Sequence, residues 1–260
     1  MIAHPSTVPV APRPCGPFKT HRQDAWWGEN VFSLVTFALF TVYTIWAVLQ
    51  NTHYEWGPYL SPFYSPHLTA MFPETFNWVK FSPAFLVIWM PLGFRATCYF
   101  CRRVYHRAVF NDPASCAVEL PKPINYTGEK AFPFVLLNMH RYFLYLALVL
   151  VVFHWSHVWQ ATQFEDGFHV GLGTLVITLD ALFLTLYVFS CHSLRHLIGG
   201  RLNHFSKSGC SQAKHTLWSV VSKLNEHHGK YFWISLFAVW AADAYVRLVA
   251  MGCLSDFRLF

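Results

Sequence analysis

Five long apolar stretches recur along the chain, and they restrict what kind of protein it can form. Each is long enough, as a helix, to cross the roughly 30 Å hydrocarbon core of a bilayer. A backbone inside a bilayer must satisfy its own hydrogen bonds, so such stretches fold as helices. The sequence therefore predicts an all-α integral membrane protein, a bundle of five transmembrane helices. The expected spans are about 31–50, 83–103, 133–155, 171–196 and 231–252.

The composition agrees with this class. Of the 260 residues, 54% are hydrophobic and only 12% are charged, which is too apolar for a soluble domain of this length. Residues 1–23 are rich in proline and lack the apolar core of a signal peptide, so we expect a flexible N-terminal arm. The transmembrane domain then covers 24–260. The net charge of +6 does not call for a nucleic-acid partner, because the basic residues gather in particular loops.

The distribution of lysine and arginine predicts the orientation. The N-terminal arm and the segments after the second and fourth spans hold most of these residues, and the segments after the other spans hold almost none. By the positive-inside rule, the N-terminus and the loops 98–132 and 191–230 face the cytoplasm. The C-terminus then lies outside.

Residue types that bind metals gather at the predicted cytoplasmic ends of three spans. Cys98 lies at the end of the second span, and His140 lies about two turns inside the third. Cys191, His192 and His196 lie at the end of the fourth, where the two histidines, four residues apart, share a helix face. Two thiolates and two imidazoles are the ligand set of a Rieske-type [2Fe-2S] centre, and they also suit structural zinc. The spacing alone leaves both open.

A transmembrane b-type haem is disfavoured. Haem ligation in a bundle needs histidines that face each other from two spans at one depth. Only the third span carries histidines in its apolar stretch, His140 and His154, and neither has a partner at matched depth.

Two further classes fit less well. A membrane di-iron hydroxylase or desaturase carries three histidine boxes, whereas this chain has one, at His192 and His196, and an incomplete pair at His227 and His228. A transporter is disfavoured because the chain lacks internal repeats and matching broken helices. A purely scaffolding role would not explain why cysteines and histidines from several spans lie at one depth.

Several runs of residues together resemble a known family. These runs are Ser61–Pro66, Pro91–Tyr99, His140–Tyr142, Cys191–His196, Gly199–Lys207 and Ala242–Arg247. They are similar to the membrane-anchor (cytochrome b-like, SdhC-type) subunit of bacterial succinate dehydrogenase, respiratory complex II. More narrowly, they resemble the haem-free class, whose anchor holds a Rieske-type [2Fe-2S] cluster in the membrane. The resemblance covers nearly everything after about Asp24.

The resemblance implies a subunit of succinate:quinone oxidoreductase in the bacterial inner (plasma) membrane. Succinate is oxidised on a soluble flavoprotein subunit, electrons cross a soluble iron–sulfur subunit, and this chain passes them to a membrane quinone, menaquinone or ubiquinone. A di-haem b anchor of the same complex is the alternative. The expected cluster ligands are Cys98, Cys191 and two among His140, His192 and His196. Cys101 departs from the family pattern and is a weaker candidate, and Cys116 is a reserve ligand.

Polar residues in the cytoplasmic half are candidates for quinone binding. We expect Arg95, Arg141 and Tyr142 to serve here, because a quinone needs hydrogen-bond donors and its reduced form is stabilised by a cation. Both arginines equally fit a position at the interface, where long side chains extend to water.

Charged residues within the spans complete the set of candidates. Asp243 and Arg247, four residues apart, are expected to pair with each other. Asp180 has no partner in its own helix, so it is a candidate proton carrier for quinone reduction, although a hydroxyl of another helix would explain it equally well.

Overall fold

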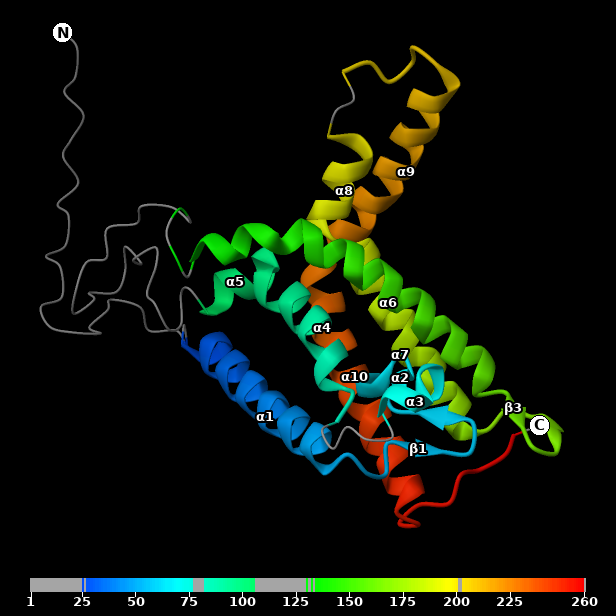
Figure 1. Ribbon diagram of the computed structural model, residues 1–260. Helices are drawn as coiled ribbons and strands as arrows, with labels where there is room; N and C mark the ends of the chain where they lie inside the picture. The colour runs from blue at the N-terminus through cyan, green and yellow to red at the C-terminus, as the bar shows by residue number, and fades with distance from the viewer. Residues whose placement is uncertain are drawn as a thin grey trace, which may run out of the picture.

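The structure is a computed structural model that describes residues 25, 27–76, 82–105, 130, 132, 134–200 and 203–259. The expected N-terminal arm and the reserve ligand Cys116 lie outside the described residues. Long helices form most of the described chain (Figure 1). Their bounds are α1 Gly28–Gln50, α4 Phe85–Thr97, α6 His140–Gln160, α7 Leu172–Phe189, α9 Gly209–Asn225 and α10 His228–Ala250.

Shorter elements connect them. The short helices are η1 Pro62–Tyr64, α2 Leu68–Met71, α3 Pro73–Phe76, α5 Tyr99–Tyr105, η3 Phe134–Met139 and α8 His192–Gly199. Two antiparallel hairpins pair β1 Glu55–Trp56 with β2 Tyr59–Leu60, and β3 Gln163–Phe164 with β4 Gly167–Phe168. The C-terminal segment returns to the β3–β4 end of the molecule, where Arg258 bridges to Gly171 (Figure 1).

Four of the described helices are long and apolar enough to cross a membrane, which agrees with the predicted all-α membrane class. They are Gly28–Gln50, Val135–Gln160, Leu172–Phe189 and His228–Ala250. The remaining predicted span contains α4, whose 13 residues rise about 20 Å and so fall short of the hydrocarbon thickness on their own.

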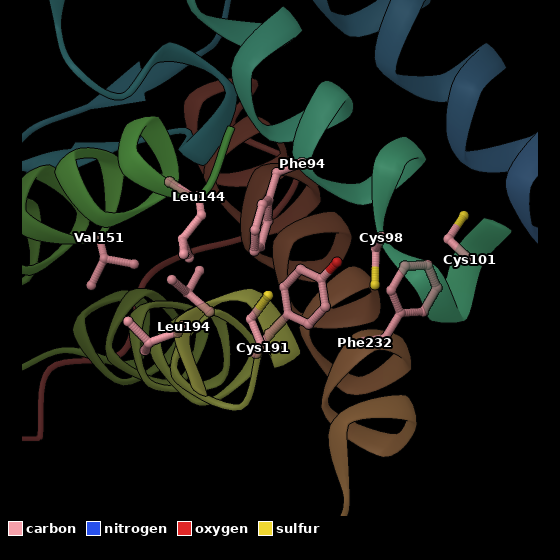
Figure 2. Packing of buried hydrophobic residues seen from close by; sticks show 11 residues of the cluster. Phe94, Cys98, Cys101, Leu144, Val151, Cys191, Leu194 and Phe232 are labelled. Carbon is pink, nitrogen blue, oxygen red and sulfur yellow. The ribbon is translucent and has the colours of Figure 1, made fainter. Parts of the chain in front are cut away.

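The packing of the helices buries several hydrophobic clusters. α10 packs against α7, α7 against α6, and α6 against α4. One hydrophobic cluster, drawn in Figure 2, joins the C-terminal end of α4 to the start of α8 and includes Phe94, Cys98, Leu144 and Cys191. A second cluster joins α1 to the loop after it and to α10.

Two of the predicted helices end earlier than expected. The second span was expected to continue to 103, but the helix breaks at Cys98, whose φ and ψ are −59° and 133°. The fourth span is predicted to continue to 196, but the helix breaks at Cys191, whose φ and ψ are −65° and 134°. The side chain of Cys191 accepts a hydrogen bond from the backbone of Ser193, as the N-cap residue of a new helix does. His192 and His196 therefore lie on a separate short helix.

The predicted cytoplasmic loop 191–230 contains a helical pair. α8 and α9 pack against each other and project beyond the other helices (Figure 1). Ser208 begins α9 with a capping box, in which it accepts from Ser211. Arg195 holds the pair together, because it donates to Ser222 at 2.8 Å and lies 4.8 Å from the ring centre of Trp218.

The ion pair predicted between Asp243 and Arg247 is confirmed, with Nε and Oδ2 2.8 Å apart. Tyr43 donates to the same carboxylate at 2.6 Å, and Ser61 also donates to it. The guanidinium donates further to two backbone carbonyl oxygens at and just beyond the C-terminal end of α1. This buried network fastens α1 and the loop after it to α10.

Replacing Asp243 by Asn should lower the free energy of unfolding by about 3–5 kcal/mol, because it leaves a buried guanidinium without its counter-charge. The measurement is the thermal unfolding midpoint of the detergent-purified complex. Asp166→Asn is the control, since Asp166 pairs with Arg258 while both side chains are about half exposed. The control should unfold close to the parent temperature. Equal midpoints for the two variants would contradict the assigned role.

Candidate metal centre

Two cysteine–histidine pairs lie at one end of the bundle. Cys98 stands between α4 and α5 and Cys191 between α7 and α8, whereas His140 begins α6 and His228 begins α10. The Sγ of Cys98 lies 3.2 Å from Nε2 of His228. The Sγ of Cys191 lies 3.1 Å from Nε2 of His140. All four side chains line one cavity, although within the described part of the chain no three ligand-type side chains lie close enough together to hold a single metal ion as they stand.

Hydroxyl groups fix the orientation of both imidazole rings. Thr97 Oγ1 lies 2.9 Å from Nδ1 of His140, and Ser190 Oγ lies 2.7 Å from Nδ1 of His228. Each hydroxyl donates its own proton to a backbone carbonyl of the preceding turn. It can therefore only accept from the ring, which assigns the proton to Nδ1. Both Nε2 atoms then carry lone pairs directed toward sulfur, as histidine ligands of a metal require.

The sulfur atoms are buried but receive backbone donors. Cys98 and Cys191 are 2% and 1% exposed. The backbone N–H of Ser193 lies 3.3 Å from the sulfur of Cys191, and backbone amides of Phe100 and Cys101 hydrogen-bond to that of Cys98. Burial disfavours a charged thiolate unless a cation lies beside it. The donors and the burial together suit thiolates held by a metal.

Aromatic rings cover the two imidazoles on their bilayer side. The ring of Phe94 stacks on His140, with centroids 4.8 Å apart and planes 8° from parallel. Tyr187 stacks on His228 in the same way, at 5.1 Å and 19°. Figure 2 shows Phe94 reaching from α4 into the core that also holds Cys98 and Cys191. The rings limit the rotation of both histidines.

The structure separates the metal ligands predicted from sequence into two groups. Cys98, His140 and Cys191 lie together in the core. His192 and His196 are exposed on α8, where Nδ1 of His196 accepts from Arg141 at 2.7 Å. They reach the rim of the same cavity without contacting the sulfur atoms.

Sequence reasoning missed His228. The sequence pattern presents it only as half of an incomplete histidine pair with His227. His228 lies just before the predicted start of the fifth span, among the same predicted cytoplasmic helix ends, and this position is the signal that could have identified it.

The residues predicted to bind quinone do not lie together. Arg95 is buried, donates to the carbonyl of Phe232 at 3.1 Å and to Ser235 at 2.9 Å, and lies over the ring of Tyr187. It therefore does not extend to the interface. Arg141 and Tyr142 are exposed on the surface of α6.

Asp180 lies deeper in the bundle, only 1% exposed. Its Oδ2 lies 4.0 Å from Nε2 of His154 on α6. Within the described part of the chain, its Oδ1 has no hydrogen-bond partner. The carboxyl is thus buried near His154, interacts electrostatically with Arg95, and is incompletely hydrogen-bonded among the described residues.

Two comparisons with known proteins find matches. The family model described as actinobacterial succinate dehydrogenase subunit SdhC matches residues 29–252. Among solved structures, the chain is similar to a chain of the Mycobacterium smegmatis Sdh1 complex in the apo form, with a TM-score of 0.83 and 36% identity. The alignment covers 95% of this chain and 97% of that one. No curated protein matches the sequence.

Proposed function

Because the chain belongs to the actinobacterial family of succinate dehydrogenase SdhC subunits, we propose that it carries electrons through a Rieske-type [2Fe-2S] cluster to a membrane quinone. Family membership makes it the membrane-anchor subunit of an enzyme complex. Its partners are the soluble flavoprotein, which oxidises succinate, and the soluble iron–sulfur subunit. The observation that carries the proposal is the pair of buried Cys–His contacts at one end of the bundle.

The donor set fits such a cluster. Cys98, Cys191, His140 and His228 provide two thiolates and two imidazoles, the ligands of a Rieske-type centre. When bound, the cluster supplies one-electron transfer. Thr97 and Ser190 hold the two imidazole rings so that both Nε2 lone pairs would face a bound cluster. The aromatic rings stacked on the imidazoles would exclude water from its bilayer side.

Arg95 contributes electrostatically to the same place. It is buried, and among the described residues no carboxylate lies within ion-pair distance of its guanidinium. A buried positive charge stabilises an electron added nearby, because the interaction is weakly screened in a medium of low dielectric constant. Arg95 would therefore favour the reduced state of a cluster or of a quinone next to it.

The same contacts argue against a haem. A bis-histidine haem needs two imidazole Nε2 atoms that face each other across the porphyrin. Here the Nε2 atoms of His140 and His228 each lie within 3.2 Å of a cysteine sulfur. Each Nε2 atom, which would have to bind the haem iron, therefore faces a cysteine sulfur instead of the other imidazole.

The ligand assignment is tested with the intact complex. His140→Ala and His228→Ala should each abolish the low-temperature paramagnetic resonance signal of a reduced [2Fe-2S] centre in the membrane subunit, and quinone reduction with it. Succinate oxidation with the soluble acceptor phenazine methosulfate should persist, because that site is on a partner chain.

His192→Ala and His196→Ala are the matched controls, and both should keep the signal. If the signal survives in His228→Ala, or is lost in His196→Ala, the exposed histidines of α8 are cluster ligands and the assignment of His228 is wrong. If metal analysis finds zinc at this site instead of iron and acid-labile sulfide, the centre is a structural zinc site and not an iron–sulfur cluster.

We further propose five spans with the N-terminus inside and the C-terminus outside, α4 being extended by its flanking residues to make the fifth. The metal-binding end and the α8–α9 pair then face the cytoplasm, where Lys207, Lys214, Lys223 and Lys230 follow the positive-inside rule. This basic surface suits docking of a soluble subunit.

The orientation is tested by labelling exposed cysteines with a membrane-impermeant maleimide. In right-side-out vesicles Cys253 should be labelled, because it is exposed beyond the end of α10. Cys210, exposed at the start of α9, should be labelled only in inverted vesicles. Cys253→Ser and Cys210→Ser identify each signal. If each cysteine is labelled in the opposite type of vesicle, the orientation of the protein is the reverse of the one proposed.

A further inference from the structure

We propose that Thr97 and Ser190 are positioning residues whose hydroxyl groups set the reduction potential of the metal centre, each acting on the histidine of the opposite cysteine–histidine pair. This inference rests on the proposed function, in which the two pairs bind a [2Fe-2S] cluster. It gives a role in electron transfer to two residues that bind no iron themselves.

The first helix break serves both pairs at once. Thr97 is the last residue of α4 and comes directly before Cys98. Its Oγ1 lies 2.9 Å from Nδ1 of His140. The other ring nitrogen of His140 faces the sulfur of Cys191 and not that of Cys98. The chain at this break therefore gives a sulfur to one pair and a hydroxyl to the other.

The second helix break repeats this crossed arrangement. Ser190 comes directly before Cys191, and its Oγ lies 2.7 Å from Nδ1 of His228. The other ring nitrogen of His228 faces the sulfur of Cys98. Two segments far apart in the sequence, each a hydroxyl residue followed by a cysteine, thus make the same pattern of contacts. Such a repetition indicates that the hydroxyl groups belong to the site and are not ordinary side chains of a helix end.

Both hydroxyl groups are buried and held by their own helices. Thr97 donates to the carbonyl oxygen of Gly93 at 2.7 Å. Ser190 donates to that of Tyr187 at 3.0 Å, and its own carbonyl oxygen accepts from Asn225 at the end of α9. The two residues are 8% and 0% exposed. Each hydroxyl therefore offers the imidazole a lone pair, in a place fixed by the backbone.

A hydrogen bond of this kind favours the oxidised state of a metal bound at the other ring nitrogen. An imidazole that donates its N–H to an acceptor is a more basic ligand, and a more basic ligand stabilises the metal when its charge is more positive. The bond is electrostatically stronger in a buried site than in water. Arg95 acts in the opposite direction, because its positive charge favours the reduced state. The two hydroxyl groups therefore lower the reduction potential that the buried arginine raises.

The test is a redox titration of the paramagnetic resonance signal in the intact complex. Thr97→Val removes the acceptor but keeps the shape of the side chain. It should favour reduction by about threefold, which raises the potential by about 28 mV, since a factor of ten is about 59 mV for one electron. Ser190→Ala should have the same effect. The double variant should reach about tenfold, or about 59 mV, because the two hydroxyl groups act on different rings.

Two further variants separate the ring contact from effects on the helix. Thr178→Val is the matched control, because Thr178 on α7 donates to the carbonyl oxygen of Thr174 at 2.7 Å, as Thr97 does within α4. Thr97→Ser keeps the hydroxyl group, and both variants should keep the parent potential. The quadrupole coupling of the Nδ1 nitrogen, measured by electron spin echo, reports the hydrogen bond of the ring N–H. It should change in Thr97→Val but not in Thr97→Ser or Thr178→Val.

Parent potentials in Thr97→Val and Ser190→Ala would overturn this inference and leave the cluster signal, and with it the proposed function, intact. An equal shift in Thr178→Val would also overturn it, because the shift would then arise from the helix. If one variant loses the signal, the other decides. Loss of the signal from both would show that the hydroxyl groups serve assembly and would reject their role in the potential. A parent complex without the signal would instead defeat the proposed function.

Discussion

The arrangement of the site depends on two cysteines that interrupt helices with the same extended backbone. Cys98 and Cys191 share φ near −60° and ψ near 133°, and each turns the chain from one helix into the next. An uninterrupted helix would carry each sulfur along its own face. The break instead directs it toward the start of a neighbouring helix, where His140 or His228 stands. Four helix ends thus meet, with sulfur paired to nitrogen and the remaining ring nitrogens held by hydroxyl groups.

The sequence predicted the membrane class, the Asp243–Arg247 pair and the common depth of Cys98, His140 and Cys191, because apolar length and helical spacing determine them. It did not predict the helix breaks. Neither cysteine is next to the glycine or proline that usually marks a break, and a side chain that caps a helix in the folded protein leaves no such mark. His228 was missed for a related reason, since its role follows from convergence of helix starts rather than from spacing along one helix.

The buried polar groups differ in how completely they are bonded, and this difference separates support from chemistry. Around Asp243, one carboxylate accepts from an arginine, a tyrosine and a serine, and the arginine's other donors are satisfied by backbone carbonyls. Such a network only holds helices together. Asp180 is just as buried, yet its Oδ1 has no hydrogen-bond partner among the described residues. Because an unsatisfied group inside a membrane is costly, helix packing alone does not explain a carboxyl at this position.

The aromatic rings stacked on the two imidazoles suggest how electrons and protons take different routes. An electron can pass from an imidazole to a ring stacked on it, whereas a proton needs a donor and an acceptor within hydrogen-bond distance at each step. The faces of Phe94 and Tyr187 offer no such chain between the metal-binding end and the apolar space on their other side. A proton must therefore reach the apolar space beyond these rings by a route different from that of an electron.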